Sequence, residues 1–329
     1  MPPVLFLSRW LALSLLCSAF LPAAAGPTLD AAGWLARLNA AATDRNYRGT
    51  MVYTAGSGVV SSSRITHLSI GDQVYERAEA LDGHQHRVYR HNEIVHSVWP
   101  HKKVVVVEQK TATPGGLVST RRRVEPRALD HYSLTPKGTS VVAGRQVQVL
   151  MLEPRDGLRF AQRLQADDST GLLLRADVLD PAGRVLESSA FTEIEIGQRA
   201  DPSAVLEGMK PAGYQVLPSR REAVDWAAQG WRLKADVAGF RLVGCVKRPA
   251  PAQGEREGLA LQAMFSDGLS FVSLFIEPYR EQAHQRALAA EMGATHTVMQ
   301  RVGEHWITAM GDVPRETLDQ FVSALERRR

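Results

Sequence analysis

The sequence predicts an α+β protein in which antiparallel sheets predominate and the chain divides into two domains. Residues 46–107 form a run of short segments rich in Val, Ile, Tyr and Thr, and residues 144–196 form a second. Alternating polarity broken by Gly, Asp and Asn is typical of an antiparallel meander. Residues 198–213 change in composition to a linker with Pro, Gly and charged residues, which predicts a domain boundary.

The chain begins with the features of a cleavable signal peptide. Arg9 is the only charge in the first 25 residues, and residues 11–21 form an apolar core followed by Ala23-Ala24-Ala25. We expect cleavage after Ala25, so residues 1–25 would be the signal peptide of an exported protein. No later segment has the roughly 20 apolar residues that a membrane helix needs, so we expect a soluble mature chain.

Cleavage would remove Cys17 and leave Cys245 as the single cysteine. One cysteine forms no internal disulfide, so apolar cores must hold the domains together, and roughly 300 residues suffice for two cores. Cys245 follows Val243 and Gly244, a context that favours a buried, inert thiol. An intermolecular disulfide is the alternative.

Residues 30–46 are predicted to form a helix that lies on a sheet. Apolar residues recur at steps of three and four, and Asp30 is a good N-cap. The strands predicted to follow are residues 48–54, 61–70, 73–80, 86–91, 93–98 and 103–108.

Residues 117–140 are basic and contain Pro126, Pro136 and Gly138, which predicts an irregular segment. A second meander follows, with turns rich in Asp, Pro and Gly. Its predicted strands are residues 144–152, 158–166, 172–179 and 184–196, and a short helix at 203–209 lies in the linker.

Beyond the linker the sequence predicts a smaller domain that mixes strands and helices. Ser266-Asp267-Gly268 is the clearest hairpin turn of the chain, and Pro314 suits the first turn of a C-terminal helix. The predicted elements are a helix or turn at 219–230, strands at 231–236, 240–247, 259–265, 269–277, 295–302 and 305–311, and helices at 279–292 and 314–329.

The charge balance does not favour a nucleic-acid-binding protein. The net charge is +4, and loss of Arg9 leaves +3, far too little to indicate such a function by itself. Two dense basic patches stand out, Arg121-Arg122-Arg123 with Arg127 and Arg220-Arg221. They can be solvated loops, or they can meet an anionic partner such as a phosphorylated lipid head group or an acidic peptide.

No catalytic motif is present, so we expect a protein that is not an enzyme and needs no cofactor. The sequence lacks a Gly-rich phosphate loop, Gly-x-Ser-x-Gly and His-Glu-x-x-His. Five of the ten histidines do fall close together, at His84, His86, His91, His96 and His101. No cysteine or carboxylate pair completes a ligand set, so we predict no metal site.

Aromatic residues along the first meander form the other group of interest. They are core residues, or they line an apolar concavity that accepts an acyl chain. The candidates for such a lining are Met51, Tyr53, Tyr75, Tyr89 and Trp99, with Tyr47 nearby.

Short motifs follow one another in a fixed order along the mature chain. They are Trp34-Leu35, Asn46-Tyr47-Arg48-Gly49, Arg64-Ile65-Thr66-His67, Glu76-Arg77, Leu81-Asp82-Gly83, Pro154 and Asp156 before Arg159-Phe160, Ser266-Asp267-Gly268-Leu269, Phe275-Ile276-Glu277-Pro278 and Gly311-Asp312-Val313-Pro314. In this order they resemble the MucB/RseB family of periplasmic regulators of the sigma-E envelope-stress response, and the resemblance covers essentially the whole mature chain. The family usually has Tyr where Phe160 stands and Glu where Asp312 stands.

The resemblance implies a fold and a domain division. Residues 26–197 should form a half-open antiparallel β-barrel with helices in its concavity, similar to the lipoprotein carriers LolA and LolB. Residues 198–212 would be the linker, and residues 213–329 a smaller domain of sheet and flanking helices.

The resemblance also implies a function. Such a protein binds the periplasmic segment of a single-span anti-sigma factor, MucA/RseA-like, and shields it from regulated proteolysis. Lipopolysaccharide, through its lipid A part, or lipoprotein acyl chains would release it, and the resemblance allows a homodimer. A periplasmic lipoprotein or lipid carrier is the alternative, although such carriers have a single domain.

We assign candidate residues on this basis. Arg121, Arg122 and Arg123 would meet lipid phosphates at the rim of the apolar lining. Arg241, Phe271 and Phe275 would contact the anti-sigma segment, although a core role suits both phenylalanines as well.

Overall fold

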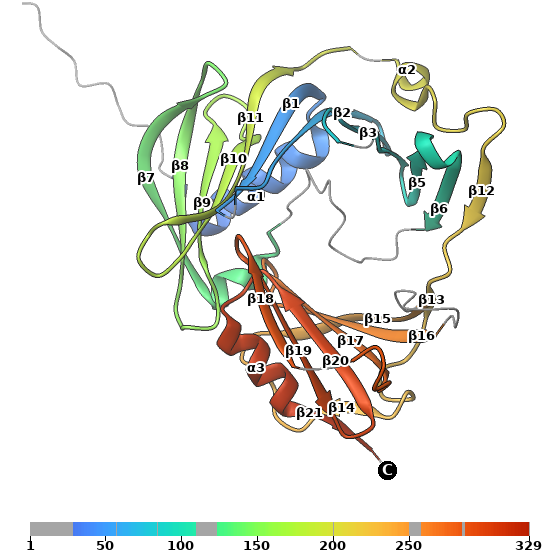
Figure 1. Ribbon diagram of the computed structural model, residues 1–329. Helices are drawn as coiled ribbons and strands as arrows, with labels where there is room; N and C mark the ends of the chain where they lie inside the picture. Colours follow the sequence, from blue (N-terminus) through green and yellow to red (C-terminus); the bar gives the residue numbers. More distant parts are fainter. Residues whose placement is uncertain are drawn as a thin grey trace, which may run out of the picture.

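The computed structural model describes residues 29–328, except residues 57, 84, 110–123, 200, 250–257 and 285–286. The expected signal peptide therefore lies outside the described residues. Within them the chain forms two large sheets, with few helices, as the sequence predicts for an α+β protein (Figure 1).

The N-terminal part is one curled sheet of twelve strands, which matches the half-open barrel expected above. Its order is β12-β6-β5-β4-β3-β2-β1-β11-β10-β9-β8-β7, and neighbours are antiparallel except for β12 and β6. The strands are β1 (Tyr47–Ala55), β2 (Val60–Ile70), β3 (Gln73–Ala80), β4 (Arg87–His91), β5 (Ile94–Trp99), β6 (Val104–Gln109), β7 (Tyr132–Val142), β8 (Arg145–Pro154), β9 (Ala161–Asp167), β10 (Leu173–Leu179), β11 (Val185–Ile196) and β12 (Gln215–Pro218).

The strands predicted in both meanders are present, and β3 has the predicted bounds. The prediction of an irregular segment at 117–140 is wrong for its second half, because β7 occupies residues 132–142 after the 3₁₀ helix η2 (Pro126–Asp130). β7 is an edge strand, and its register with β8 shifts between Pro136 and Thr139. An edge strand with a bulge tolerates Pro and Gly, so these residues did not exclude a strand here.

Helix α1 (Ala31–Asp44) lies inside the curl of the sheet (Figure 1). The Asp30 side chain caps it by accepting a 2.7 Å hydrogen bond from the Gly33 amide, as predicted. Its apolar stripe, Trp34, Leu35 and Leu38, packs into a core with residues of η2 and β7–β9. The helix therefore fills one half of the space inside the curled sheet.

The segment after β11 is docked on the outer face of the same sheet. Helix α2 (Pro202–Leu206) buries Val205, and Met209 and Tyr214 pack against Tyr89 of β4 and its neighbours. The chain then adds β12 parallel to β6, with Gln215 opposite Val104. The sheet therefore continues past residue 212, where we expected the second domain to begin.

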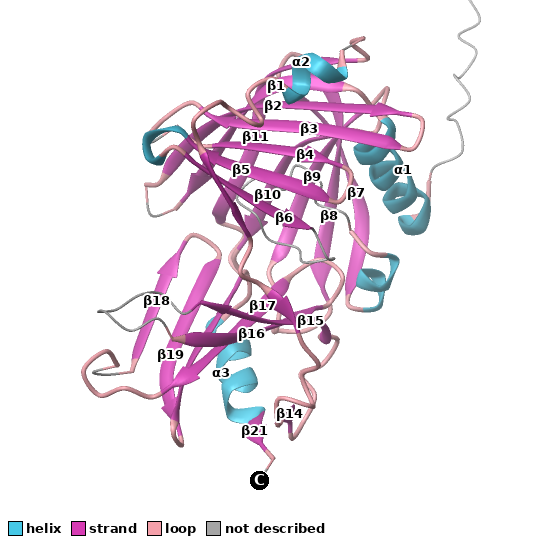
Figure 2. Ribbon diagram, turned by 90° about the vertical axis from the view of Figure 1, so that its right-hand side faces the viewer, coloured by secondary structure: helices cyan, strands magenta, loops and turns pink. Residues whose placement is uncertain are grey.

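The C-terminal part is a sheet of seven strands with α3 on one face (Figure 2). Its order is β13-β15-β16-β17-β20-β19-β18, and a small separate sheet pairs β14 with β21. The elements are β13 (Glu222–Ala223), β14 (Trp231–Leu233), β15 (Arg241–Pro249), β16 (Leu259–Ser266), β17 (Phe271–Pro278), β18 (Leu288–Met292), β19 (Thr295–Val302), β20 (His305–Gly311), α3 (Arg315–Ala324) and β21 (Leu325–Arg327).

Two helix predictions in this part need correction. Residues 279–292 are not helical: turns follow β17, and β18 then pairs with β19. The Ala, Glu and Gln residues there favour a helix only weakly, and sheet pairing overrides such a preference. The C-terminal helix also ends at Ala324, because residues 325–327 pair with β14.

The two sheets meet at the β16–β17 turn. Ser266, Asp267, Leu269 and Ser270 are all buried, and Leu269 joins the core that holds α1. The clearest turn of the sequence is thus part of the joint between the sheets.

Candidate functional site

The curled sheet separates the aromatic candidates of the first meander onto its two faces. Register places Met51, Tyr53 and Trp99 on the inner face, where Met51 packs near Ala41 of α1. Tyr75 and Tyr89 lie on the outer face, and Tyr89 is fully buried beside Met209. Only the first three can therefore line a common concavity.

The inner-face candidates reach as far as the C-terminal sheet. Burial and the neighbouring Glu187 carboxylate raise the pKa of the Tyr53 phenol, which therefore stays protonated and can donate. Glu187 in turn accepts a 3.0 Å hydrogen bond from the amide of Ala294, in the β18–β19 turn. This turn therefore borders the inner face beside Tyr53.

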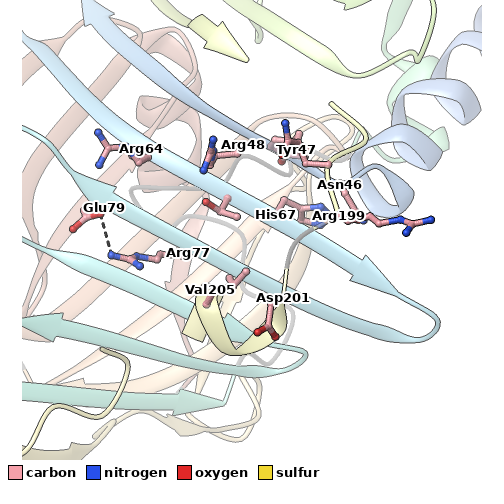
Figure 3. Close-up of a pocket in the computed structure, with 13 residues that line it drawn as sticks. Asn46, Tyr47, Arg48, Arg64, His67, Arg77, Glu79, Arg199, Asp201 and Val205 are labelled. Carbon is pink, nitrogen blue, oxygen red and sulfur yellow. Dashed lines mark hydrogen bonds and ion pairs between the residues drawn. The ribbon is translucent and has the colours of Figure 1, made fainter. Parts of the chain in front are cut away.

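Arg121, Arg122 and Arg123 lie outside the described residues, but the structure reveals other arginines around a pocket on the outer face (Figure 3). The pocket has a volume of about 430 Å³ and lies between β1–β3 and the segment that leads into α2. Four arginines and two carboxylates line it, so it carries a net positive charge. They are Arg48, Arg64, Arg77, Arg199, Glu79 and Asp201.

Sequence reasoning missed this pocket. Arg48 and Arg64 stand on different strands and are brought together only by the β1–β2 register. Arg199 belongs to the predicted linker, whose position against the sheet is not visible in the sequence. Part of the positive charge is already neutralised, because Arg77 lies 3.2 Å from Glu79 and Arg48 lies 3.0 Å from Glu195.

The three candidates for the partner contact do come together. Arg241 pairs with Ser266, and Ser266 pairs with Phe271. Phe275 stands four residues further along β17, an even number, so all three occupy the sheet face opposite α3. The core under α3 takes the alternate residues Val272, Leu274 and Ile276 instead. Phe271 and Phe275 are half-buried, and neither is in that core.

Methionines dominate the same face of the C-terminal sheet, which we call the methionine face. Paired positions place Met264, Met292, Met299 and Met310 there, half of the eight methionines in the chain. Met310 is 40% exposed and Met292 49% exposed, whereas Met299 is half-buried and Met264 is buried. Flexible, polarizable side chains of this kind form adaptable binding surfaces.

The strands of the methionine face carry more positive than negative charge. Arg241, Arg248 and Arg301 lie on it, and Glu277 is the one carboxylate among its described strand residues. Arg248 lies over the Phe275 ring at 5.7 Å, and Arg301 lies over Tyr279 at 4.1 Å. The face is thus apolar with cationic margins, which suits an apolar segment that carries carboxylates.

The histidines of the first meander make separate contacts. His86 stacks on Trp99 at 4.7 Å, His91 stacks on Tyr75 at 4.6 Å, and His96 is buried, while His84 lies outside the described residues. In the part of the chain that the structure describes, no three His, Cys, Asp or Glu residues form a group that could hold a metal ion.

Cys245 is buried on β15 within the core under α3. Burial, with a smaller effect from Asp225, raises the pKa of its thiol to about 11. The thiol is therefore protonated at neutral pH and weakly reactive.

Of the helices in the described ranges, none has the length and apolar character needed to cross a bilayer.

Comparison with known proteins identifies relatives along nearly the full length. Residues 30–209 match the family model of the MucB/RseB N-terminal domain, and residues 225–326 match that of the MucB/RseB C-terminal domain. The sigma factor AlgU regulatory protein MucB of Pseudomonas aeruginosa is 29% identical, over 96% of this chain and 97% of its own. The sigma-E factor regulatory protein RseB of Haemophilus influenzae is 25% identical, over 97% of both.

Solved structures of MucB also resemble this chain along most of its length. The crystal structure of MucB in complex with MucA(peri) is 26% identical in sequence and superimposes with a TM-score of 0.69. It covers 91% of this chain and 100% of the MucB chain. A second structure, the Pseudomonas aeruginosa MucA/MucB complex, gives a TM-score of 0.70 at 26% identity, over 91% of this chain and 99% of that one.

Proposed function

Since the chain belongs to the MucB/RseB family, we propose that it is a negative regulator of sigma-E (AlgU-type) envelope-stress signalling in the periplasm. It would act by binding the periplasmic segment of a membrane anti-sigma factor and shielding that segment from regulated proteolysis. Binding alone suffices for this role, so no catalytic residue is required.

One observation carries the proposal. A relative that matches this chain over both domains has been solved with MucA(peri), and its fold covers 91% of this chain. The methionine face supports the same role, since Phe271, Phe275 and Met310 present apolar surface that the chain does not fully cover. Apolar side chains left partly open to solvent on one sheet face are typical of protein interaction sites.

Release by lipid is the second part of the proposal. Acyl chains would enter the inner face of the curled sheet beside Met51, Tyr53 and Trp99, and Arg121–Arg123 would meet the lipid phosphates. The lipid needs only to prefer the released state, because it shifts the equilibrium by its difference in affinity for the two states.

A binding assay tests the regulatory role. Purified mature protein is mixed with the periplasmic segment of a MucA/RseA-like anti-sigma factor from the same organism, with and without lipopolysaccharide. We expect binding that the lipid reverses, together with slower cleavage of the bound segment by the regulatory protease. Lipid uptake without any binding of the segment would contradict regulation and indicate a lipid carrier.

Replacing Arg121, Arg122 and Arg123 together with Ala tests the lipid contact. We expect weaker lipopolysaccharide binding, by about tenfold or more since charge-assisted contacts to phosphate are lost, with unchanged binding of the anti-sigma segment. A matched variant replaces three exposed arginines elsewhere, Arg155, Arg184 and Arg315, and should bind the lipid normally. Equal loss of lipid and segment binding would contradict this assignment.

A further inference from the structure

The two large sheets end in four edge strands, and three of them have features that prevent further pairing. β7 carries Pro136, Lys137 and a register shift. β12 has four residues and ends in Pro218, and β13 has only two residues. Proline, lysine, bulges and short length are the usual means by which proteins block an open sheet edge.

The fourth edge, β18, has none of these features. It has the sequence Leu288-Ala289-Ala290-Glu291-Met292, with no Pro or Lys, and it pairs with β19 without a register shift. All five residues are exposed, and Leu288 and Met292 are each 49% exposed. A regular, exposed and apolar edge strand is a template for another strand.

The β18–β19 hairpin identifies which backbone groups of β18 are available. Met292 pairs with Thr295 across the two-residue turn Gly293-Ala294, and the pair that closes such a turn is hydrogen-bonded. Hydrogen-bonded and non-hydrogen-bonded pairs alternate along an antiparallel ladder. The N–H and C=O groups of Ala289 and Glu291 therefore point outward, away from β19.

The side chains of β18 extend the methionine face. Leu288 pairs with Met299, and Ala290 pairs with Thr297, which pairs with Met310. A strand added at this edge would place every second side chain on the same apolar face. Of the face's arginines, Arg301 lies on the neighbouring strand β19, two residues beyond Met299, whereas Arg241 and Arg248 lie on β15, away from this edge. A carboxylate at the end of the added strand that lies beside Leu288 would therefore be favoured by Arg301.

We propose that the anti-sigma segment binds as an additional antiparallel or parallel strand on β18. The occupant is an extended segment with apolar residues at alternate positions and a carboxylate at the end that lies near Arg301. Main-chain hydrogen bonds to Ala289 and Glu291 supply its affinity, and the methionine face supplies its selectivity. This inference rests on the proposed function, since it specifies how the partner of that function is held.

Ala289→Pro tests the proposal directly. Proline removes one outward N–H and leaves the ladder with β19 intact, because the Ala289 amide is not part of that ladder. We expect affinity for the anti-sigma segment to fall by about tenfold or more. Ala289→Gly is the matched control, since it keeps the N–H, and it should bind within about twofold of the unchanged protein. Circular dichroism and thermal unfolding establish that both variants fold.

Hydrogen exchange on the unchanged full chain gives an independent readout. The amides of Ala289 and Glu291 should exchange fast in the free protein and slowly in the complex, while that of Ala290 is protected in both. Unchanged exchange at Ala289 and Glu291 on binding would overturn strand addition, as would an Ala289→Pro variant that binds normally.

The remaining outcomes are also decisive. If the unchanged protein does not bind the segment, the proposed function fails and this inference fails with it. If Ala289→Pro abolishes self-association in sedimentation but not segment binding, the occupant of β18 is a second copy of this chain, and the inference is wrong.

Discussion

At the scale of single residues, Asp167 has the most hydrogen-bonded carboxylate of the N-terminal sheet described here. Its two oxygens accept from Arg145 Nε at 2.6 Å, from Ser169 Oγ at 2.6 Å, and from the amide and hydroxyl of Thr170 at 2.8 Å each. Burial favours the neutral acid, but these hydrogen bonds outweigh it and hold the pKa of Asp167 well below its usual range.

This lowered pKa makes stability depend on pH in a defined direction. A carboxyl whose folded pKa is lower than its unfolded pKa stabilises the fold fully above the unfolded value, near 4, and loses the contribution as pH falls. We expect Asp167→Asn to lower the free energy of unfolding at pH 7 by on the order of 2 kcal/mol. The deficit should shrink as the pH falls from about 4 towards 2.

Urea unfolding at several pH values measures this effect. The control is Asp168→Asn, because Asp168 is exposed and adjacent in the same turn. It should unfold like the unchanged protein at every pH. A constant deficit for Asp167→Asn across the acid range would show that the lost contacts do not depend on ionisation.

The Asp167 turn also shows what a sequence can reveal at this scale. Residues 167–171 have the composition of a turn, and a turn is there. Arg145, which neutralises Asp167, stands 22 residues earlier and reaches it because β8 pairs with β9. The pocket arginines were missed for the same reason, since pairing across strands is not visible in a local pattern.

At the scale of elements, the alternation of apolar and polar residues predicted strands well wherever a tight turn separated them. It also placed Phe271 and Phe275 on one face, because they belong to one strand. It could not show whether Tyr53 and Tyr89 lie on the same face of the sheet. For residues on different strands, the face depends on the length of every turn and the register of every strand pair between them. β18 was predicted as a helix because its residues favour one, and its hairpin pairing with β19 decides against it.

Gly49 on β1 shows how closely neighbouring strands approach. A Cβ there would lie 2.4 Å from the backbone oxygen of Glu193 on β11 and 2.9 Å from the Phe191 ring. We expect Gly49→Ala to destabilise the fold by about 2 kcal/mol, because the β11 backbone cannot move without disturbing two ladders. Chemical denaturation followed by tryptophan fluorescence measures it.

Gly157→Ala is the matched control for that substitution. A Cβ at Gly157 meets no atom within 4 Å. The variant should be as stable as the unchanged protein or slightly more stable, since alanine restricts the unfolded chain. Equal effects at positions 49 and 157 would mean that the close approach to β11 does not determine the cost.

At the scale of the whole molecule, one buried ion pair joins the two sheets. Arg159, between β8 and β9, has its Nε 2.6 Å from Asp267 in the β16–β17 turn, and both side chains are fully buried. Arg159 also pairs with Asp156 and donates to the Ala238 carbonyl. Since turns normally lie at the surface, the sequence predicted this turn without indicating that it would be buried between domains.

Further contacts at the joint explain why it is closed to solvent. The Tyr132 hydroxyl donates to Asp267 over 3.3 Å, and burial with the nearby carboxylate raises the pKa of this tyrosine, so it remains a donor. Asp267 Oδ1 accepts from the amides of Leu269 and Ser270. Leu269 extends into the core of the larger sheet. Buried polar contacts and Leu269 therefore link the two domains, which should unfold together.

Asp267→Asn tests this joint while keeping the Oδ1 acceptor and the size of the side chain. It leaves the buried Arg159 guanidinium without its closest carboxylate, so the free energy of unfolding should fall by about 3 kcal/mol. Because the lost contact is between domains, calorimetry should resolve two transitions where the unchanged protein gives one. Asp319→Asn breaks the exposed pair with Arg315, 3.5 Å long, and should cost less than about 1 kcal/mol. If both variants lose the same small amount, Asp267 does not hold the domains together, and the apolar contact of Leu269 is left as the feature that joins them.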